Sequence, residues 1–475
     1  MPNDPDVPPD PPRPRRPLRY VLAILLAVLL SPVAACAVWT QIEVTRVDRA
    51  FDALQAKNEP LDPAEFDLKP ATSEQREASH LYAQAANLVG EGMPTQATTL
   101  GKTIEELCAF PSAAGRRPET AALVAFEDRY KPALDLLDRA SQLDASGWDD
   151  ADRPKPQSMD VLRPRSLAAV NAVRIGRLAC TGDGEAAAAA LLSTLRLRRV
   201  LTMSFYASLP MMQAAHGLQS LLTFTSPNPV LLQKIQKEYE AATDEHALER
   251  QLLYSRANWL HFASPGVFSD PPAGFAARRI TPIEGIANRL ARPLRDHGLV
   301  AELREFDEAL QAGRQPLPAR LDAAAVLAKK YPSVRSQSRR PGLLEFFGRP
   351  FGSHSGSFSL SIAVARDAEA LARTRASVGA LAVARYRHAH DGALPAALHD
   401  LIPEYLSAPL IDPYSGKELQ YRRGDRSQYK VYSIGTNRQD DGGVWEQHSD
   451  LQLSRRGDPP DIGIAVGASP AAGGS

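Results

Sequence analysis

The chain has 475 residues, 44% of them hydrophobic and 23% charged, and this length suits about two or three domains. Lysine plus arginine and aspartate plus glutamate balance at 55 each, so the formal net charge is zero. This balance gives no global electrostatic argument for binding nucleic acid or anionic lipid, and we expect no nucleic-acid partner.

The first 40 residues predict a membrane helix. Residues 1–19 are rich in proline and arginine, and we expect them to form a disordered cytoplasmic tail. Residues 20–40 carry no charged side chain, and about 20 apolar residues suffice to cross the hydrocarbon core of a bilayer as a helix. The basic flank of that stretch consists of Arg13, Arg15, Arg16 and Arg19. Because basic residues mark the cytoplasmic side, the pattern predicts a single-pass protein of a bacterial inner membrane with its bulk in the periplasm.

A second interpretation of the same stretch is a cleaved secretory signal. Residues 33–36, with the sequence VAAC, resemble the bacterial lipobox, in which cleavage precedes a lipid-modified cysteine, here Cys36. The apolar run continues past this cysteine to Trp39, which suits a membrane interface, and no polar tether follows it. Those features favour a retained anchor over a lipoprotein. Either interpretation places most of the chain outside the cytoplasm.

Residues 41–335 predict a non-repetitive helical extracytoplasmic domain. Helical spacing of apolar residues marks segments 40–57, 73–88, 120–143, 228–240, 243–262 and 286–330, the last interrupted near Pro316 and Pro318. The clearest unit is a helical hairpin over 166–203. Gly182 suits the end of its first helix and Asp183 can cap the second. Asn228 followed by Pro229 is likewise a helix start signal.

The sequence pattern over residues 360–466 predicts a small α+β module near the end of the chain. We expect a loop over 336–359, a long helix over 360–390, strands over 418–423, 428–434 and 461–466, and a disordered tail over 467–475. The first two strands should form a hairpin through 424–427, within a short antiparallel sheet. The predicted fold class is therefore mainly α, with an N-terminal transmembrane helix and a small sheet at the C-terminus.

An ordered series of motifs carries a resemblance to a known family. The motifs are ARYR (384–387), GALP (392–395), LHDLIPEYL (398–406), DPYSG (412–416), LQYR (419–422), VYSIG (431–435) and DDGG (440–443). This series resembles the C-terminal half of the major pseudopilins of type II secretion systems. It is also similar to the tails of uncharacterised bacterial membrane-anchored proteins with a helical middle. The resemblance covers about 100 residues, counted along the motif series and its flanks.

The resemblance implies a helix packed on a small antiparallel sheet, with Ca²⁺ held by the loop after the second strand. The ligands it implies lie among Asn437, Asp440, Asp441 and Asp461, with Asp458 as a further candidate. Calcium takes six to eight oxygen ligands, and glycines allow a loop to fold around it. From the residues alone, a solvated acidic turn is the alternative. No other cofactor is expected.

The chain departs from the pseudopilin pattern at its N-terminus. A pseudopilin begins with a short leader, a cleavage glycine and a phenylalanine-rich helix that carries a glutamate near its start, and this chain does not show that pattern at its N-terminus. The pilin-like helix at 360–390 follows a predicted loop and not a membrane span. The resemblance therefore does not imply polymerisation into a pilus.

Catalytic patterns are weak along the whole sequence. The motif GSHSG (352–356) has His354 at its centre instead of a nucleophilic serine, so it fails as a hydrolase elbow. His246 and Glu249 are spaced i,i+3 beside Asp244 and Glu245, a pattern that suits metal ligands but is more typical of a charged helix face. Two extracytoplasmic cysteines, Cys108 and Cys180, fit either a disulfide or two buried thiols.

Two functional hypotheses follow. The first is a non-enzymatic scaffold or assembly protein of the bacterial envelope, related to secretion and bound to a protein partner as well as to the membrane. The second is an extracytoplasmic hydrolase acting on peptide or cell-wall substrates. The absence of a recognisable nucleophile, metal or phosphate motif favours the first hypothesis.

Overall fold

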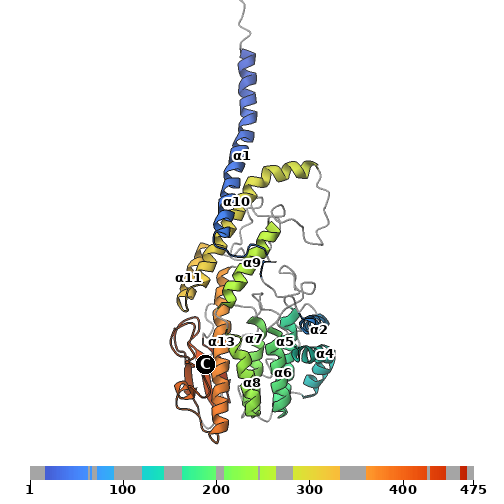
Figure 1. The fold of residues 1–475 in the computed structure, drawn as a ribbon, viewed down its shortest axis with the longest axis vertical. Coiled ribbons are helices and arrows are strands. Elements are labelled where there is room, and N and C mark those ends of the chain that lie inside the picture. Colours follow the sequence, from blue (N-terminus) through green and yellow to red (C-terminus); the bar gives the residue numbers. More distant parts are fainter. Residues whose placement is uncertain are drawn as a thin grey trace, which may run out of the picture. The chain divides into compact units, whose positions relative to one another are not determined.

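A computed structural model describes residues 17–62, 65–66, 72–89, 120–143, 163–198, 208–243, 246–263, 282–331, 360–424, 428–444 and 461–467. Within these residues the protein is mainly helical, with one small antiparallel sheet near the C-terminus (Figure 1). The predicted fold class is confirmed at this level. Residues 1–16 of the tail predicted over 1–19, the loop predicted over 336–359 and residues 468–475 of the tail predicted over 467–475 lie outside the described residues. Residues 17–19, which were predicted to be disordered, form the start of helix α1 (Pro17–Gln55) instead.

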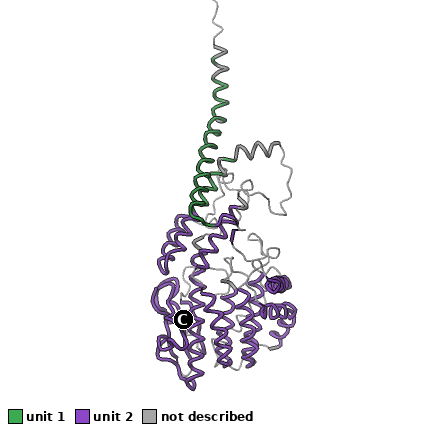
Figure 2. The backbone as a smooth tube through the Cα atoms, in the orientation of Figure 1, with its two compact units in different colours: residues 1–59, 263–304, 339–353 green, residues 60–262, 305–338, 354–475 purple. Residues whose placement is uncertain are grey.

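The chain divides into two compact units, shown in different colours in Figure 2. Unit 1 comprises Met1–Glu59, Ala263–Arg304 and Arg339–Ser353, and unit 2 comprises Pro60–Phe262, Glu305–Ser338 and His354–Ser475. The predicted boundaries fell at residues 335 and 360 instead. The structure thus groups the predicted C-terminal module with most of the helical domain.

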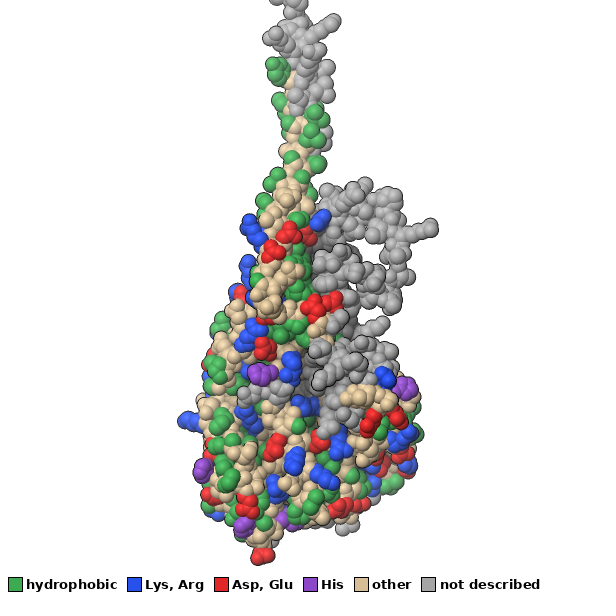
Figure 3. All heavy atoms as spheres, viewed as in Figure 1, with side chains coloured by type: hydrophobic (Ala, Val, Ile, Leu, Met, Phe, Trp, Pro, Cys, Tyr) green, Lys and Arg blue, Asp and Glu red, His purple; other side chains and the backbone are tan. Residues whose placement is uncertain are grey.

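Unit 1 is dominated by helix α1, Pro17–Gln55. Its segment Ile24–Gln55 is long and apolar enough to span a membrane, and none of its most apolar window is buried. Hydrophobic side chains such as Ile24, Val28 and Val33 lie exposed along it (Figure 3). The prediction of a membrane-length apolar helix is confirmed. Helix α10, Pro282–Gly313, contributes its residues up to Arg304 to the same unit.

Unit 2 contains nearly all the remaining helices. They are α2 (Ser73–Val89), α4 (Thr120–Ser141), α5 (Arg163–Cys180), α6 (Gly184–Leu197), α7 (Ser208–Phe224), α8 (Pro229–Glu240), α9 (Ala247–Ala263), α11 (Ala319–Lys330) and α13 (Leu360–Ala389). Helices α2 and α4 pack on α5, and α7 packs on α5, α6 and α13. Except for α7, each of these helices was predicted from apolar periodicity.

Local signals explain several helix boundaries. Gly182 adopts a φ of +87° between α5 and α6, and the Asp183 carboxylate accepts a hydrogen bond from the Ala186 amide. The predicted helical hairpin is therefore confirmed, with glycine in the left-handed conformation and aspartate as cap. Asn228 caps α8 by accepting from the Val230 amide at 2.8 Å, with Pro229 in the first turn.

The sheet has the order β1-β2-β3, with both strand pairs antiparallel. Its strands are β1 (Gln420–Arg423), β2 (Tyr429–Ser433) and β3 (Ile462–Val466), which confirms the hairpin and the third strand. Tyr421 lies opposite Val431, and Val431 lies opposite Ile464. The turn residues 425–427 are outside the described part of the chain.

One hydrophobic core runs from the helices of unit 2 into the sheet. It joins Ile175 of α5, Leu218 of α7 and Ile235 of α8 to Leu381 of α13 and Val431 of β2. Alanines and small residues of α13 are buried over most of its length, because helices and strands pack around it. Gly379 of α13 allows this contact, since an added Cβ there would lie 2.9 Å from the Val431 side chain. Helix α13 is thus the central element of unit 2.

Candidate functional site

The loop after β2 brings together the residues predicted to bind calcium. It runs over 434–444 and turns through positive φ angles at Gly435, Arg438, Gly442 and Gly443. A Cβ on Gly443 would lie 2.9 Å from the Lys430 side chain and 3.0 Å from the Tyr432 ring. The loop therefore folds tightly back onto β2, which requires glycine at this position.

Asp440 is held by donors from the sheet and the loop. Its Oδ1 accepts from the Tyr432 hydroxyl at 2.8 Å and from the Gly442 amide at 2.9 Å, and its Oδ2 accepts from Arg422 at 2.8 Å. Burial acts to raise the pKa of Asp440, but the hydrogen bonds from Gly442, Tyr432 and Arg422 outweigh it and lower the pKa. Both carboxylate oxygens of Asp440 are therefore committed to contacts within the protein.

Asp461 is the buried carboxylate of this region, with 2% of its surface exposed. Its Oδ2 accepts from the amides of Gly443 at 2.8 Å and Val444 at 3.3 Å. Its Oδ1 has no hydrogen-bond partner among the described residues. Burial raises the pKa of Asp461, the amide hydrogen bonds lower it, and the nearby negative charge of Asp441 raises it further. This orphaned oxygen is the feature of the loop that best suits a cation.

Asn437 and Asp441 form a separate, exposed pair. The Asn437 side-chain amide donates to Asp441 Oδ2 at 2.8 Å, while the Asn437 carbonyl accepts from the Gln439 amide at 2.9 Å. The structure thus places Asn437, Asp440 and Asp441 in the loop after β2 and Asp461 beside it immediately before β3, but gives them different partners. Asp458 lies outside the described residues.

The fit of these residues to calcium is partial. Among the residues that the structure describes, no group of three histidine, cysteine, aspartate or glutamate side chains is placed to hold a metal ion. Asp461 offers an open oxygen and Asp441 lies near it, whereas Asp440 would have to leave Arg422 to become a ligand. Calcium binding stays a prediction.

Asp412 is a structural residue that the sequence marked only as part of a turn. It is buried and accepts hydrogen bonds from the Ser433 hydroxyl at 2.6 Å, the Tyr414 amide at 2.9 Å, the Ser415 hydroxyl at 3.0 Å and the Ile434 amide at 3.2 Å. Asp412 thereby ties the DPYSG turn to the point where β2 ends and the loop begins. The sequence offered one signal for this role. Asp412 precedes the Tyr414 amide by two positions and the Ser415 hydroxyl by three, a spacing that is typical of an aspartate in a turn.

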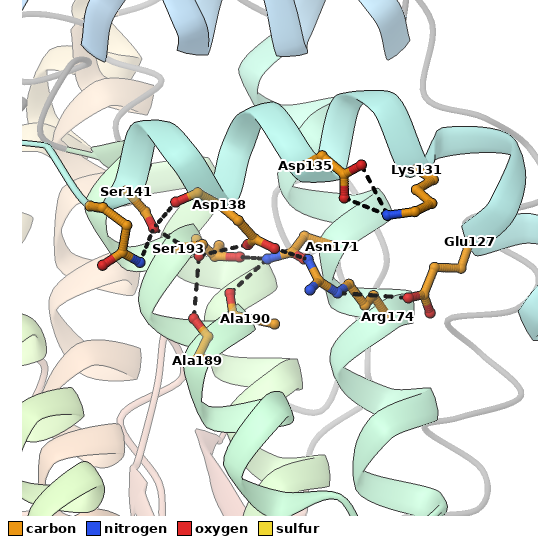
Figure 4. A network of polar contacts seen from close by, with 12 residues as sticks. Glu127, Lys131, Asp135, Asp138, Ser141, Asn171, Arg174, Ala189, Ala190 and Ser193 are labelled. Carbon is orange, nitrogen blue, oxygen red and sulfur yellow. Dashed lines mark hydrogen bonds and ion pairs between the residues drawn. The ribbon is translucent and has the colours of Figure 1, made fainter.

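A second polar network joins α4, α5 and α6 (Figure 4). Arg174 donates to Asp138 Oδ2 at 2.8 Å and lies 3.8 Å from Glu127, and Ser193 donates to Asp138 Oδ1 at 3.0 Å. Ser193 is buried, and none of the labelled residues in this network is a histidine or a cysteine. A serine nucleophile needs an adjacent base and access to substrate, so we interpret the network as an interhelical contact.

Asn171 completes the contact between α5 and α6. Its side-chain amide donates to the Ala190 carbonyl at 2.7 Å and to the Thr194 hydroxyl at 2.8 Å. Asn171 is fully buried, so these bonds satisfy a donor that would otherwise be costly inside the helical core. This network had no counterpart in the sequence prediction, because its members are up to 55 positions apart.

The remaining candidates are dispersed. His246 lies 3.8 Å from Glu249, but Glu249 also accepts from Arg314 at 2.6 Å, and Asp244 and Glu245 lie outside the described residues. Burial raises the pKa of Glu305 in α10, as it does for Asp461, but the two carboxylates lie on different elements.

Among the described residues, Cys36 and Cys180 are both free thiols. Cys36 is within α1, where its carbonyl accepts from the Thr40 hydroxyl at 2.8 Å. Burial raises the pKa of the Cys180 thiol to about 11, so this thiol is not activated as a nucleophile. Cys108, its candidate disulfide partner, is outside the described residues.

Comparison with known proteins gives no relative from which a role can be transferred. No protein-family model, no curated protein and no solved structure matches the chain.

Proposed function

We propose that the protein is anchored by α1 in a bacterial inner membrane, with its N-terminus in the cytoplasm and unit 2 outside it. The observation that carries this proposal is the exposure of apolar side chains along α1, such as Leu26 at 58% and Val33 at 62%. Exposed apolar surface of this extent is costly in water and favourable in lipid. The arginines that precede α1 in the sequence support the orientation.

The proposed role is that of a non-enzymatic scaffold or assembly protein of the envelope, related to secretion and bound to a protein partner. The packing of α13 supports a role other than pilus formation, because this helix is surrounded by α7, α8, α11 and the sheet of its own chain. The resemblance of residues 384–443 to a secretion-system module points in the same direction.

A fusion experiment tests the location. Alkaline phosphatase joined after Ser475 should be active in intact cells, and a fluorescent protein that folds only in the cytoplasm should be dark at the same position. The reverse pattern would overturn the proposed orientation. A chain with Arg13, Arg15, Arg16 and Arg19 replaced by glutamine is the matched variant and should give a mixed pattern, because the charge bias is removed.

A crosslinking experiment tests the role. The intact chain is crosslinked in whole cells and purified, and residues 1–59 joined to alkaline phosphatase serve as the control. A defined protein captured by the intact chain but not by the control is the expected result. Hydrolysis of peptidoglycan by the purified chain, with no specific partner captured, would overturn the scaffold role.

We also propose, from the resemblance, that Ca²⁺ binds the loop after β2. The ligands would include oxygens of Asn437, Asp441 and Asp461, with Asp440 joining them only if it leaves Arg422. When bound, the ion would supply positive charge that holds the loop against β3. Calcium should raise the melting temperature of the intact protein but not of the Asp461→Asn variant, whereas identical melting in calcium and EDTA would contradict the proposal.

A further inference from the structure

Glu43 is the buried carboxylate of unit 1. Its side chain is 2% exposed, and its Oε1 receives a hydrogen bond from Trp39 Nε1 at 3.1 Å and from Arg46 at 2.8 Å, both on α1. The third neighbour comes from another element, because His297 Nδ1 of α10 lies 3.4 Å from the same oxygen. Glu43 Oε2 has no hydrogen-bond partner among the described residues. Glu43 is therefore the point at which α10 meets α1.

The position of this contact along α1 is informative. Trp39 ends the apolar stretch, and Glu43 follows it by one helical turn, or about 6 Å of helix length. If residues 20–40 cross the bilayer, as proposed above, the Glu43–His297 contact lies at the level of the lipid headgroups. Helix α10 must then pass the membrane surface at His297.

The sequence of α10 before His297 has the pattern of a helix that lies on a membrane. Apolar residues recur at Ile283, Ile286, Leu290 and Leu294, which is the spacing of one face of a helix. The arginines fall on the opposite side of a helical wheel and are Arg289, Arg292 and Arg295. Asp296 lies on the same side, 3.4 Å from Arg292, so this face keeps a net positive charge with one arginine paired. Helices with one apolar face and arginines on the other bind lipid surfaces, and the binding is stronger where the lipid is anionic.

We propose that residues 282–299 of α10 form an amphipathic helix on the lipid surface beside α1, held there by the contact between His297 and Glu43. The inference rests on the proposed membrane anchor and adds a second membrane contact to it. The occupant of the apolar face is the bilayer, because α10 is joined to the membrane helix itself and its arginines complement anionic headgroups. Unit 1 then binds the membrane through a crossing helix and a surface helix together.

Spin labels on single cysteines test the proposal in the full chain. The native cysteines are replaced by alanine, and the protein is reconstituted in vesicles of phosphatidylcholine and phosphatidylglycerol. Labels at Ile286→Cys and Leu290→Cys should be accessible to oxygen and shielded from a water-soluble nickel complex. Labels at Asn288→Cys and Arg292→Cys should show the opposite accessibility.

The outcomes separate this inference from the proposal on which it rests. A label at Val28→Cys reports on the anchor alone and should be accessible to oxygen only. If that label is lipid-buried while those at 286 and 290 are exposed to nickel, the surface helix is overturned and the anchor stands. If the labels at 286 and 290 are shielded from both reagents, a protein covers the face, and the lipid assignment is overturned. Exposure of the Val28 label to nickel would overturn the anchor itself.

A pair of variants tests the role of the contact. Glu43→Gln and His297→Ala should each lower the oxygen-to-nickel accessibility ratio at position 290 several-fold, because α10 loses its attachment to α1. His246→Ala, which removes an exposed histidine of unit 2, is the control and should leave the ratio unchanged. An unchanged ratio in both test variants would overturn the assignment of this contact as the attachment.

Discussion

At the scale of single residues, Asp412 shows how one buried carboxylate organises a turn and a strand end. Its oxygens accept four hydrogen bonds, from Tyr414, Ser415, Ser433 and Ile434, and two of these donor residues, Tyr414 and Ser433, are buried together with Asp412 itself. Loss of the acceptor leaves several buried donors without a partner, and each such loss is costly.

We expect Asp412→Ala to lower the free energy of unfolding by about 3 kcal/mol, the sum expected for a charged acceptor with several buried donors. Asp135→Ala is the control, because Asp135 is 56% exposed and only pairs with Lys131 along α4. The control should change stability by less than about 0.5 kcal/mol. Denaturant unfolding of the three proteins measures both values, and equal losses would contradict the assigned role of Asp412.

Asp461 and Asp440 should make opposite contributions to the pH dependence of stability. The pKa of Asp461 is raised in the folded protein, chiefly by burial, so its contribution is present at low pH and is lost as the pH rises through the folded pKa. The pKa of Asp440 is lowered by its hydrogen bonds, which outweigh burial, so its contribution is present above the unfolded pKa and is lost as the pH falls.

Replacement by asparagine removes each titration. The stability of the wild type relative to Asp461→Asn should therefore fall as the pH rises above the ordinary aspartate pKa of about 3.9 and through the raised folded pKa. The stability of the wild type relative to Asp440→Asn should instead rise as the pH rises from the lowered folded pKa towards that ordinary value, and it should level off above it. Unfolding curves in calcium-free buffer measure both differences, and slopes of the same sign would contradict the assignment.

At the scale of elements, α8 depends on a cap that the sequence already marked. Asn228 accepts from the Val230 amide, and Asn228→Ala should lower the free energy of unfolding by about 1 kcal/mol because that donor loses its partner. Asn228→Ser keeps an oxygen at the cap and should retain most of the stability. Thermal unfolding compares the variants, and an equal loss in both would show that the cap is not responsible.

Helix α7 explains where the sequence prediction failed. Its segment Ser208–Phe224 is apolar or small over most of its surface, for example at Met211 and Leu221, and its polar residues form only a narrow stripe that includes Gln213, His216 and Thr223. It also contains Gly217, which disfavours helix but is needed here. An added Cβ at Gly217 would lie 3.0 Å from the Ile175 side chain of α5. The helical structure of α7 depends on tertiary packing, which a local sequence pattern does not reveal.

The sequence predicted which residues belong to the candidate loop, but not which partners they contact. The glycines and aspartates of the loop are close in the sequence, and the resemblance to the pseudopilin tail implied that Asn437, Asp440 and Asp441 belong to one site. The partner of each depends on the fold. Arg422 reaches Asp440 from β1, and the Gly443 amide reaches Asp461 across 18 positions of the chain. Spacing along the sequence does not reveal these contacts. The sequence therefore could not predict that one carboxylate oxygen of Asp461 lacks a hydrogen-bond partner among the described residues.

At the scale of the whole molecule, Arg256 joins three parts of unit 2 that are far apart in the sequence. Its side chain, fully buried on α9, donates to the Pro60 carbonyl at 3.3 Å and lies 3.5 Å from Asp307 of α10. Nearby, Phe66 packs edge-to-face on Tyr254 of α9 with ring centroids 5.3 Å apart. These contacts bind the first residues of unit 2 to α9.

We expect Arg256→Gln to lower the free energy of unfolding by about 3 kcal/mol, because the variant breaks a buried charged contact and leaves the Pro60 carbonyl and Asp307 without this donor. Trypsin should also cleave faster after Lys57, just ahead of the segment that Arg256 binds. Arg314→Gln is the control, since Arg314 is 41% exposed and its ion pair with Glu249 should contribute less than about 1 kcal/mol. Unchanged cleavage in Arg256→Gln would refute this role.

Helix α1 continues without a break well beyond its apolar stretch. Residues 40–55 contain neither glycine nor proline and extend the helix by about 24 Å. A helix resists bending and twisting over that length, whereas a polar coil would absorb both. If α1 crosses a bilayer, as proposed above, pull or torque arising there is carried along a rigid helix to within five residues of Pro60, where unit 2 begins.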